Sequence, residues 1–145
     1  MRCQAPIGVG VCLLICSPAR TSEPNVPMAA RFLKALATGM ESPPRVAVTA
    51  VAMREELQRN GVAIDPAAPI VWVETGQEAR ERAARGRLVV CPQPELIDQG
   101  AAIAVFVAEG RFTVRYSLPN ARKAGATIPE MVVKLGKPHI SEPIS

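Results

Sequence analysis

The chain has 145 residues, of which 48% are apolar and 21% are charged, and its formal net charge at pH 7 is +4. These proportions are typical of a globular protein and exclude a chain that stays disordered for want of apolar side chains. The length fits one domain. Lysines and arginines are spread along the chain and aromatic residues make up only 3% of it, so nucleic-acid binding is not expected.

Residues 1–19 have the three parts of a secretory signal peptide. Arg2 precedes an apolar stretch over 7–16, and the Ser-Pro-Ala triplet at 17–19 places small residues where cleavage requires them. The apolar stretch is about half the ~20 residues that a membrane-spanning helix needs, and no later segment comes closer. We therefore predict export, cleavage after Ala19 and no membrane insertion of the mature chain. A buried N-terminal strand or helix is the alternative interpretation.

Cleavage would leave Cys91 as the only cysteine of the mature chain, because Cys3, Cys12 and Cys16 lie in the signal peptide. No disulfide could then form within the domain. Cys91 closes the apolar run Leu88–Val90, which favours burial at the end of a strand. The alternative is a free thiol that pairs between chains.

Residues 20–44 are predicted to form a leader and an opening helix. Asn25 followed by Pro27 is typical of a helix start. Apolar side chains then recur at helical spacing over 28–40, as on the core-facing side of an amphipathic helix. The prolines at 43–44 end the helix, since proline disfavours helix in the residue before it.

Residues 45–136 predict an α/β domain. Short apolar runs that alternate with helix-forming stretches are typical of parallel strands covered by helices. The expected strands are 45–51, 70–73 and 88–91, and the expected helices between them are 53–60 and 77–85. The strands expected over 102–108 and 111–118 are joined by Glu109 and Gly110 alone, which indicates an antiparallel hairpin. We expect a small Rossmann-like three-layer α/β domain, its short parallel sheet extended by this C-terminal antiparallel hairpin.

A short helix is expected over 129–135, and residues 137–145 are predicted to be a flexible tail. The single histidine, His139, lies in that tail, so neither a Ser-His-Asp triad nor a zinc site is expected. Ala50–Met53 follow the first strand in place of a glycine-rich phosphate cradle. The sequence thus predicts no enzyme, cofactor or metal site. A hydrolase would require Cys91 to be exposed, with a lowered pKa and a basic neighbour.

Residues in the last third of the chain have the order and spacing of a known family signature. They are Gln99, Gly100, Ile103, Phe106, Glu109–Arg111, Leu118, Ala121–Gly125, Ile128 and Val132–Leu135. They resemble the end of the YfiR family, also called the DUF4154 family, which has a glycine-turned hairpin, an alanine- and arginine-rich turn with glycine, and a leucine-rich last helix. Upstream, 29–38 and 45–49 look like the family's opening helix and first strand. The chain departs from the family at Ala101, Ala102 and Ser117, and its middle is shorter by about one strand-helix unit.

The resemblance implies a periplasmic protein that acts by binding another protein. Family members restrain an inner-membrane diguanylate cyclase by binding its periplasmic part, which lowers cyclic di-GMP output and biofilm formation. The disulfides common in the family are not implied here, because Cys91 would be alone. The sequence leaves open whether the chain forms a homodimer.

Four residues are candidates for contact with such a partner, because interfaces are rich in arginine and aromatic side chains. They are Trp72, if it proves exposed, Arg115, Arg122 and Lys123. The competing interpretation is a core tryptophan and solvent-exposed charges. A different class of function is an exported small-molecule binding domain, whose ligand would lie at the carboxyl ends of the parallel strands near Val51, Glu74 and Cys91.

Overall fold

The computed structural model describes residues 25–83 and 87–139. Its first helix, α1 (Val26–Met40), begins where the sequence predicts, because the Asn25 side chain accepts a hydrogen bond from the Met28 amide at 3.1 Å and proline stands in the first turn. Its apolar face is buried, with Leu33 and Leu36 no more than 1% exposed. Residues 1–19, the predicted signal peptide, lie outside the described residues.

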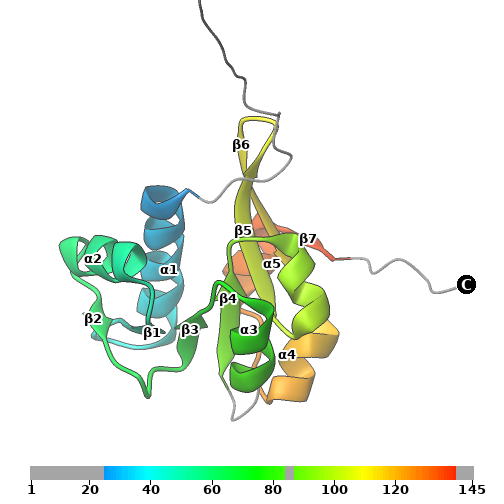
Figure 1. Ribbon diagram of the computed structural model, residues 1–145, viewed down its shortest axis with the longest axis horizontal. Helices are drawn as coiled ribbons and strands as arrows, with labels where there is room; N and C mark the ends of the chain where they lie inside the picture. Colours follow the sequence, from blue (N-terminus) through cyan, green and yellow to red (C-terminus); the bar gives the residue numbers. More distant parts are fainter. Residues whose placement is uncertain (1–24, 84–86, 140–145) are drawn as a thin grey trace, which may run out of the picture.

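A seven-stranded sheet with the order β2-β1-β3-β4-β5-β6-β7 forms the centre of the domain (Figure 1). The strands are β1 (Arg45–Val48), β2 (Ala63–Ile64), β3 (Ile70–Trp72), β4 (Leu88–Cys91), β5 (Ile103–Ala108), β6 (Arg111–Tyr116) and β7 (Lys137–Pro138). Only β5 and β6 pair in antiparallel fashion, and every other neighbouring pair is parallel. The predicted small Rossmann-like α/β fold, with its antiparallel hairpin after the parallel strands, is therefore confirmed.

Two hydrophobic layers enclose the sheet because alternate side chains of each strand point to opposite faces. One layer packs α1 and α2 (Val51–Arg59) on the first face, and the other packs α3 (Gly76–Arg82) and the 3-10 helix η2 (Pro94–Gln99) on the second. In β3, for example, Trp72 belongs to the first layer and Val71 to the second. The three-layer arrangement expected from the sequence follows from this alternation.

The prediction of a strand over 45–51 is wrong at its C-terminal end, because β1 stops at Val48 and α2 begins at Val51. The sequence also did not predict β2 or β7, each of which has only two residues. Strands this short carry no periodic signal, and their pairing is decided by the neighbouring strand rather than by their own residues.

The prediction of a flexible tail is wrong for residues 137–139. Lys137 and Pro138 pair with Arg115 and Tyr116 as β7, and the His139 amide donates to the Tyr116 carbonyl at 2.7 Å. β7 is an edge strand, the position in a sheet where proline is tolerated. Residues 140–145 of the predicted tail lie outside the described residues.

The β5–β6 hairpin projects beyond the helices at the top of Figure 1. Its turn uses the left-handed conformation at both central residues, with φ of 52° at Glu109 and 76° at Gly110, as the tightest hairpin turns require. After β6, Ser117 caps α4 (Leu118–Ala124) by accepting from the Asn120 amide at 3.2 Å. The last helix, α5 (Glu130–Leu135), follows and leads into β7.

Arg45 joins the end of α1 to the first strands. Its guanidinium bonds Glu41 at 2.8 Å and also bonds Asp65, the residue that follows β2. The hydrogen bond from Arg45 lowers the pKa of Glu41, and those from the Ala67 amide and from Arg45 lower the pKa of Asp65.

Candidate functional site

The order of strands reverses between β1 and β3, and ligands bind beside the carboxyl ends of such strands in many open α/β sheets. Glu78 bridges the segments that follow these two strands. Its carboxylate accepts from the Thr49 hydroxyl at 3.1 Å and from the Glu74 amide at 3.2 Å, and its own amide donates to the capping hydroxyl of Thr75. These polar groups thus bond to one another and tie the end of β1 to the start of α3.

The structure brings only part of the proposed small-molecule site to solvent. Val51 is 56% exposed and Glu74 is exposed, but the Cys91 side chain is fully buried at the end of β4. The Glu74 carboxylate accepts the indole N–H of Trp72 at 2.9 Å. Three cavities are lined by other described residues, before β3 and β4, along β6 and against α4.

The prediction that Cys91 is buried at a strand end is confirmed. Its thiol donates to the backbone carbonyl of Gln93 at 3.1 Å, and it has no disulfide partner among the described residues. Burial raises the pKa of the Cys91 thiol to about 12. The thiol is therefore protonated near neutral pH and shielded from solvent, which is the opposite of the exposed, low-pKa group that a cysteine nucleophile requires.

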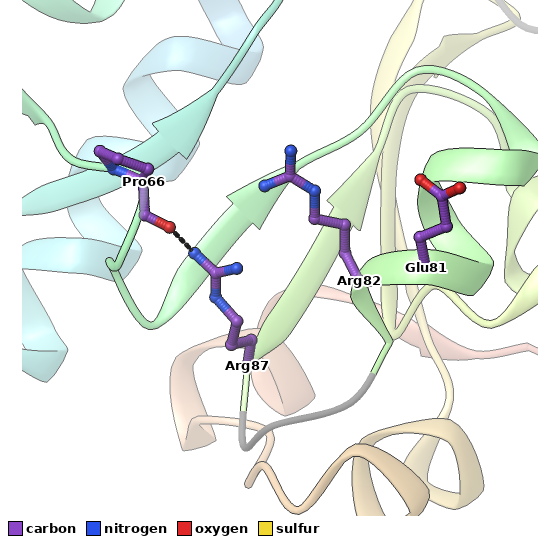
Figure 2. Close-up of a pocket in the computed structure, with 4 residues that line it drawn as sticks. All are labelled: Pro66, Glu81, Arg82 and Arg87. Atoms are coloured by element: carbon purple, nitrogen blue, oxygen red, sulfur yellow. Dashed lines mark hydrogen bonds between the residues drawn. The ribbon is translucent and has the colours of Figure 1, made fainter.

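One cavity, of about 590 Å³, lies near the amino ends of β3 and β4, beside the end of α3 (Figure 2). Its described walls are Pro66, Glu81, Arg82 and Arg87. Arg87 points toward the loop before β3 and donates to the Pro66 carbonyl, and also to the Ala68 carbonyl at 3.1 Å. Because these bonds hold the loop against the start of β4, Arg87 has a structural role in this wall.

A groove of about 550 Å³ follows β6, and we call it the β6 groove. It is lined by Ala108, Glu109, Arg111–Arg115, Leu135 and Lys137. The strand register places Lys137 directly beside Arg115, so two cations are neighbours on one face of the sheet. Leu135 is 63% exposed at the end of α5 and gives the groove an apolar side. The groove combines an apolar wall with a row of basic side chains.

A smaller cavity, of about 210 Å³, lies against α4. Its walls are Leu118, Ala121, Arg122, Ala126, Thr127 and Ile128. Leu118 is 46% exposed here, which leaves an apolar surface open beside Arg122.

Three of the four candidate contact residues are exposed, namely Arg115, Arg122 and Lys123. Arg115 lies in the β6 groove, whereas Arg122 borders the cavity at α4 and Lys123 follows it along that helix. Trp72 is only 3% exposed, so its condition for a contact role is not met. The interpretation of Trp72 as a core aromatic is confirmed, because β3 is a central strand with both faces covered.

Sequence reasoning missed Phe112, Leu135 and Lys137 as members of a shared groove. Lys137 was assigned to a flexible tail, and nothing in the local sequence indicates that it pairs with β6. The alternation of basic and apolar residues over 111–116 was the available signal, since it placed Arg111 and Arg115 on one face.

His139 is also placed differently from its predicted position outside the core. Its side chain is 11% exposed, and its Nε2 lies 3.3 Å from an Asp98 carboxylate oxygen. The Nδ1 atom is buried without a hydrogen-bond partner among the described residues. Pairing of β7 with β6 brings the imidazole against the end of η2.

Within residues 25–83 and 87–139, no group of three or more His, Cys, Asp or Glu side chains gathers in a way that could hold a metal ion. None of the helices in these ranges is both long and apolar enough to cross a membrane. Comparisons with protein-family models, curated proteins and solved structures found no match to this chain.

Proposed function

We propose that this chain is an exported regulatory protein that restrains an inner-membrane diguanylate cyclase by binding its periplasmic part, thereby lowering cyclic di-GMP signalling and biofilm formation. The observation that carries the proposal is the resemblance of the last third of the chain to the YfiR family. The structure adds support, because three glycines of that resemblance lie at a turn or at the end of a helix.

The glycines of the resemblance stand where the backbone needs them. Gly100 ends η2 with φ of 119°, Gly110 turns the hairpin, and Gly125 ends α4 with φ of 78°. Residues other than glycine rarely adopt this conformation. The spacing of the resemblance is therefore the spacing of a 3-10 helix, a hairpin and two helices.

The departures from the family fit the same local structure. Ser117 replaces an asparagine and caps α4 with its hydroxyl, and serine and asparagine are equally good helix caps. Ala101 and Ala102 are no more than 1% exposed, so these replacements face the core rather than a partner.

Regulation of this kind requires no bond to be made or broken. The protein would bind the inactive state of the cyclase more tightly than the active state, and the populations would shift by that difference in affinity. A tenfold difference corresponds to about 1.4 kcal/mol, which a modest surface supplies.

Two measurements in the producing bacterium test the proposal. Intact-mass analysis of the periplasmic fraction should find the chain without residues 1–19, and deletion of the gene should raise cyclic di-GMP. Restoring the full chain should lower cyclic di-GMP again, whereas a variant that begins at Arg20 behind a new start methionine should not. A cytoplasmic full-length product, or unchanged cyclic di-GMP on deletion, would refute the proposal.

A further inference from the structure

Strand β7 covers only part of the outer edge of β6. β5 pairs with β6 along its whole length from Arg111 to Tyr116, but β7 pairs only with Arg115 and Tyr116. The stretch 111–114 therefore has one partner strand among the described residues, and its other edge faces the β6 groove. An uncovered strand edge is a template for a further strand.

Three contacts show which backbone amides and carbonyls of β6 point toward β5 and which point toward the outer edge. The Ser117 amide donates to the Ala102 carbonyl on the β5 side, whereas the Tyr116 carbonyl accepts from His139 on the β7 side. The Val114 carbonyl also points outward, because it lies close to Gly136. In an antiparallel pair this direction alternates residue by residue, so the amide and carbonyl of Phe112 point outward too, with no β7 residue opposite them.

Side chains on the two faces of this edge differ in character. Phe112 packs toward the first hydrophobic layer, with its ring centroid 6.2 Å from that of Phe32, and Leu135 lines the same groove. Arg111, Thr113 and Arg115 alternate with it and therefore point to the opposite face.

The basic side chains of the groove have no anionic partner among residues 25–83 and 87–139. Arg111, Arg115 and Lys137 form no ion pair within the described residues, whereas Arg45, Arg59 and Lys134 each do. Of the described residues that line the groove, Glu109 at the hairpin turn is the one with an acidic side chain. Like charges directly opposite on neighbouring strands are unfavourable, and an anionic strand would relieve the repulsion between Arg115 and Lys137.

We propose that the β6 groove docks an extended segment of a protein partner, in which acidic and aliphatic side chains alternate. The segment adds a strand next to Phe112, its acidic side chains contact Arg111, Arg115 and Lys137, and its aliphatic side chains contact Phe112 and Leu135. This inference rests on the proposed function in one respect, namely that the chain acts by binding a protein. A second copy of this chain does not fit, because two β6 edges would place arginines against arginines.

The test uses the purified protein, labelled with ¹⁵N, and a short capped peptide of alternating glutamate and valine. The peptide should shift the amide signals of 111–114 and bind with a measurable Kd that weakens as salt is added. The double substitution Arg115→Glu and Lys137→Glu should weaken binding at least tenfold. The matched control, Arg31→Glu with Lys34→Glu, makes the same change in charge on the exposed side of α1 and should bind within about twofold of the wild type.

Three further probes identify what the groove recognises. A lysine-valine peptide should not bind, and a glutamate-valine peptide with alternate backbone nitrogens methylated should bind at least tenfold more weakly, because it cannot pair as a strand. Vesicles of phosphatidylglycerol test a membrane surface as the occupant. Equal binding of the methylated peptide, equal binding by the charge-reversed protein, binding to vesicles alone, or no binding of the glutamate-valine peptide would each overturn the inference.

The two proposals fail separately in these experiments, since the peptide assay contains no cyclase. Peptide binding without any effect of gene deletion on cyclic di-GMP refutes the proposed function and leaves the docking site intact. If deletion raises cyclic di-GMP and the charge-reversed protein lowers it again to the wild-type level, the docking site alone is refuted.

Discussion

The buried thiol of Cys91 makes the stability of this domain depend on alkaline pH. The side chain is fully buried, and its pKa is about 12 in the folded chain against an ordinary value of 9.0. Between these values the unfolded chain releases the thiol proton and the folded chain keeps it. The contribution to the free energy of unfolding is therefore complete below pH 9 and is lost as the pH rises toward 12.

The magnitude follows from the pKa difference, since each unit corresponds to about 1.4 kcal/mol. At pH 11, two units above the ordinary pKa, the free energy of unfolding of the wild type should have fallen by about 3 kcal/mol relative to that of a variant without the thiol. Cys91→Ala is that variant. Loss of the buried sulfur should make it about 1 kcal/mol less stable than wild type at pH 7.

The assay is urea denaturation of both proteins between pH 7 and pH 11 in the presence of a reductant. All other side chains are the same in both proteins, so their contributions cancel in the difference. We expect Cys91→Ala to be the less stable protein at pH 7 and the more stable one at pH 11. A difference that stays constant over this range would refute the raised pKa and with it the burial of the thiol.

Three substitutions and one quenching measurement test other parts of the fold. Gly136→Ala would place a Cβ atom 2.8 Å from the Val114 carbonyl oxygen, so urea denaturation should show a loss of about 1–3 kcal/mol, and an unchanged value would contradict this close approach. Asn120→Ala removes an amide that donates to two backbone carbonyls at 2.6 and 2.9 Å and should cost about 1–3 kcal/mol in the same assay. Arg45→Met removes the hydrogen bonds that lower two carboxylate pKa values. Wild type should therefore be the more stable protein at neutral pH, and its advantage should shrink as the pH falls below about 4. Trp72, the one tryptophan of the chain and only 3% exposed, should resist iodide quenching until the protein unfolds.

The elements that could be predicted are those with a local signal. The helix over 26–40 has a cap, a proline in its first turn and a continuous apolar face, and the hairpin over 103–116 has a two-residue turn between alternating strands. Such signals depend on residues a few positions apart. They were therefore visible before any tertiary contact was known.

The candidate site could be predicted only in part. The alternation over 111–116 identified Arg115 as an exposed cation, but its neighbour Lys137 lies far along the chain and joins it only through β-pairing. Trp72 is the opposite case, a candidate that the structure removes. Its aromatic side chain is of a type common at interfaces, but its position in a central strand buries it. Neither outcome is decided by residues close in sequence.

By itself, the sequence determined the fold class, the first helix, the hairpin and the burial of Cys91, because hydrophobic periodicity and turn residues act over short distances. The tertiary structure alone decided the strand order, the addition of β7 to the edge and the meeting of Arg115, Lys137 and Leu135 in one groove. These features depend on pairing between distant segments, where the free energy comes from the partner strand and the packed layers rather than from local preference.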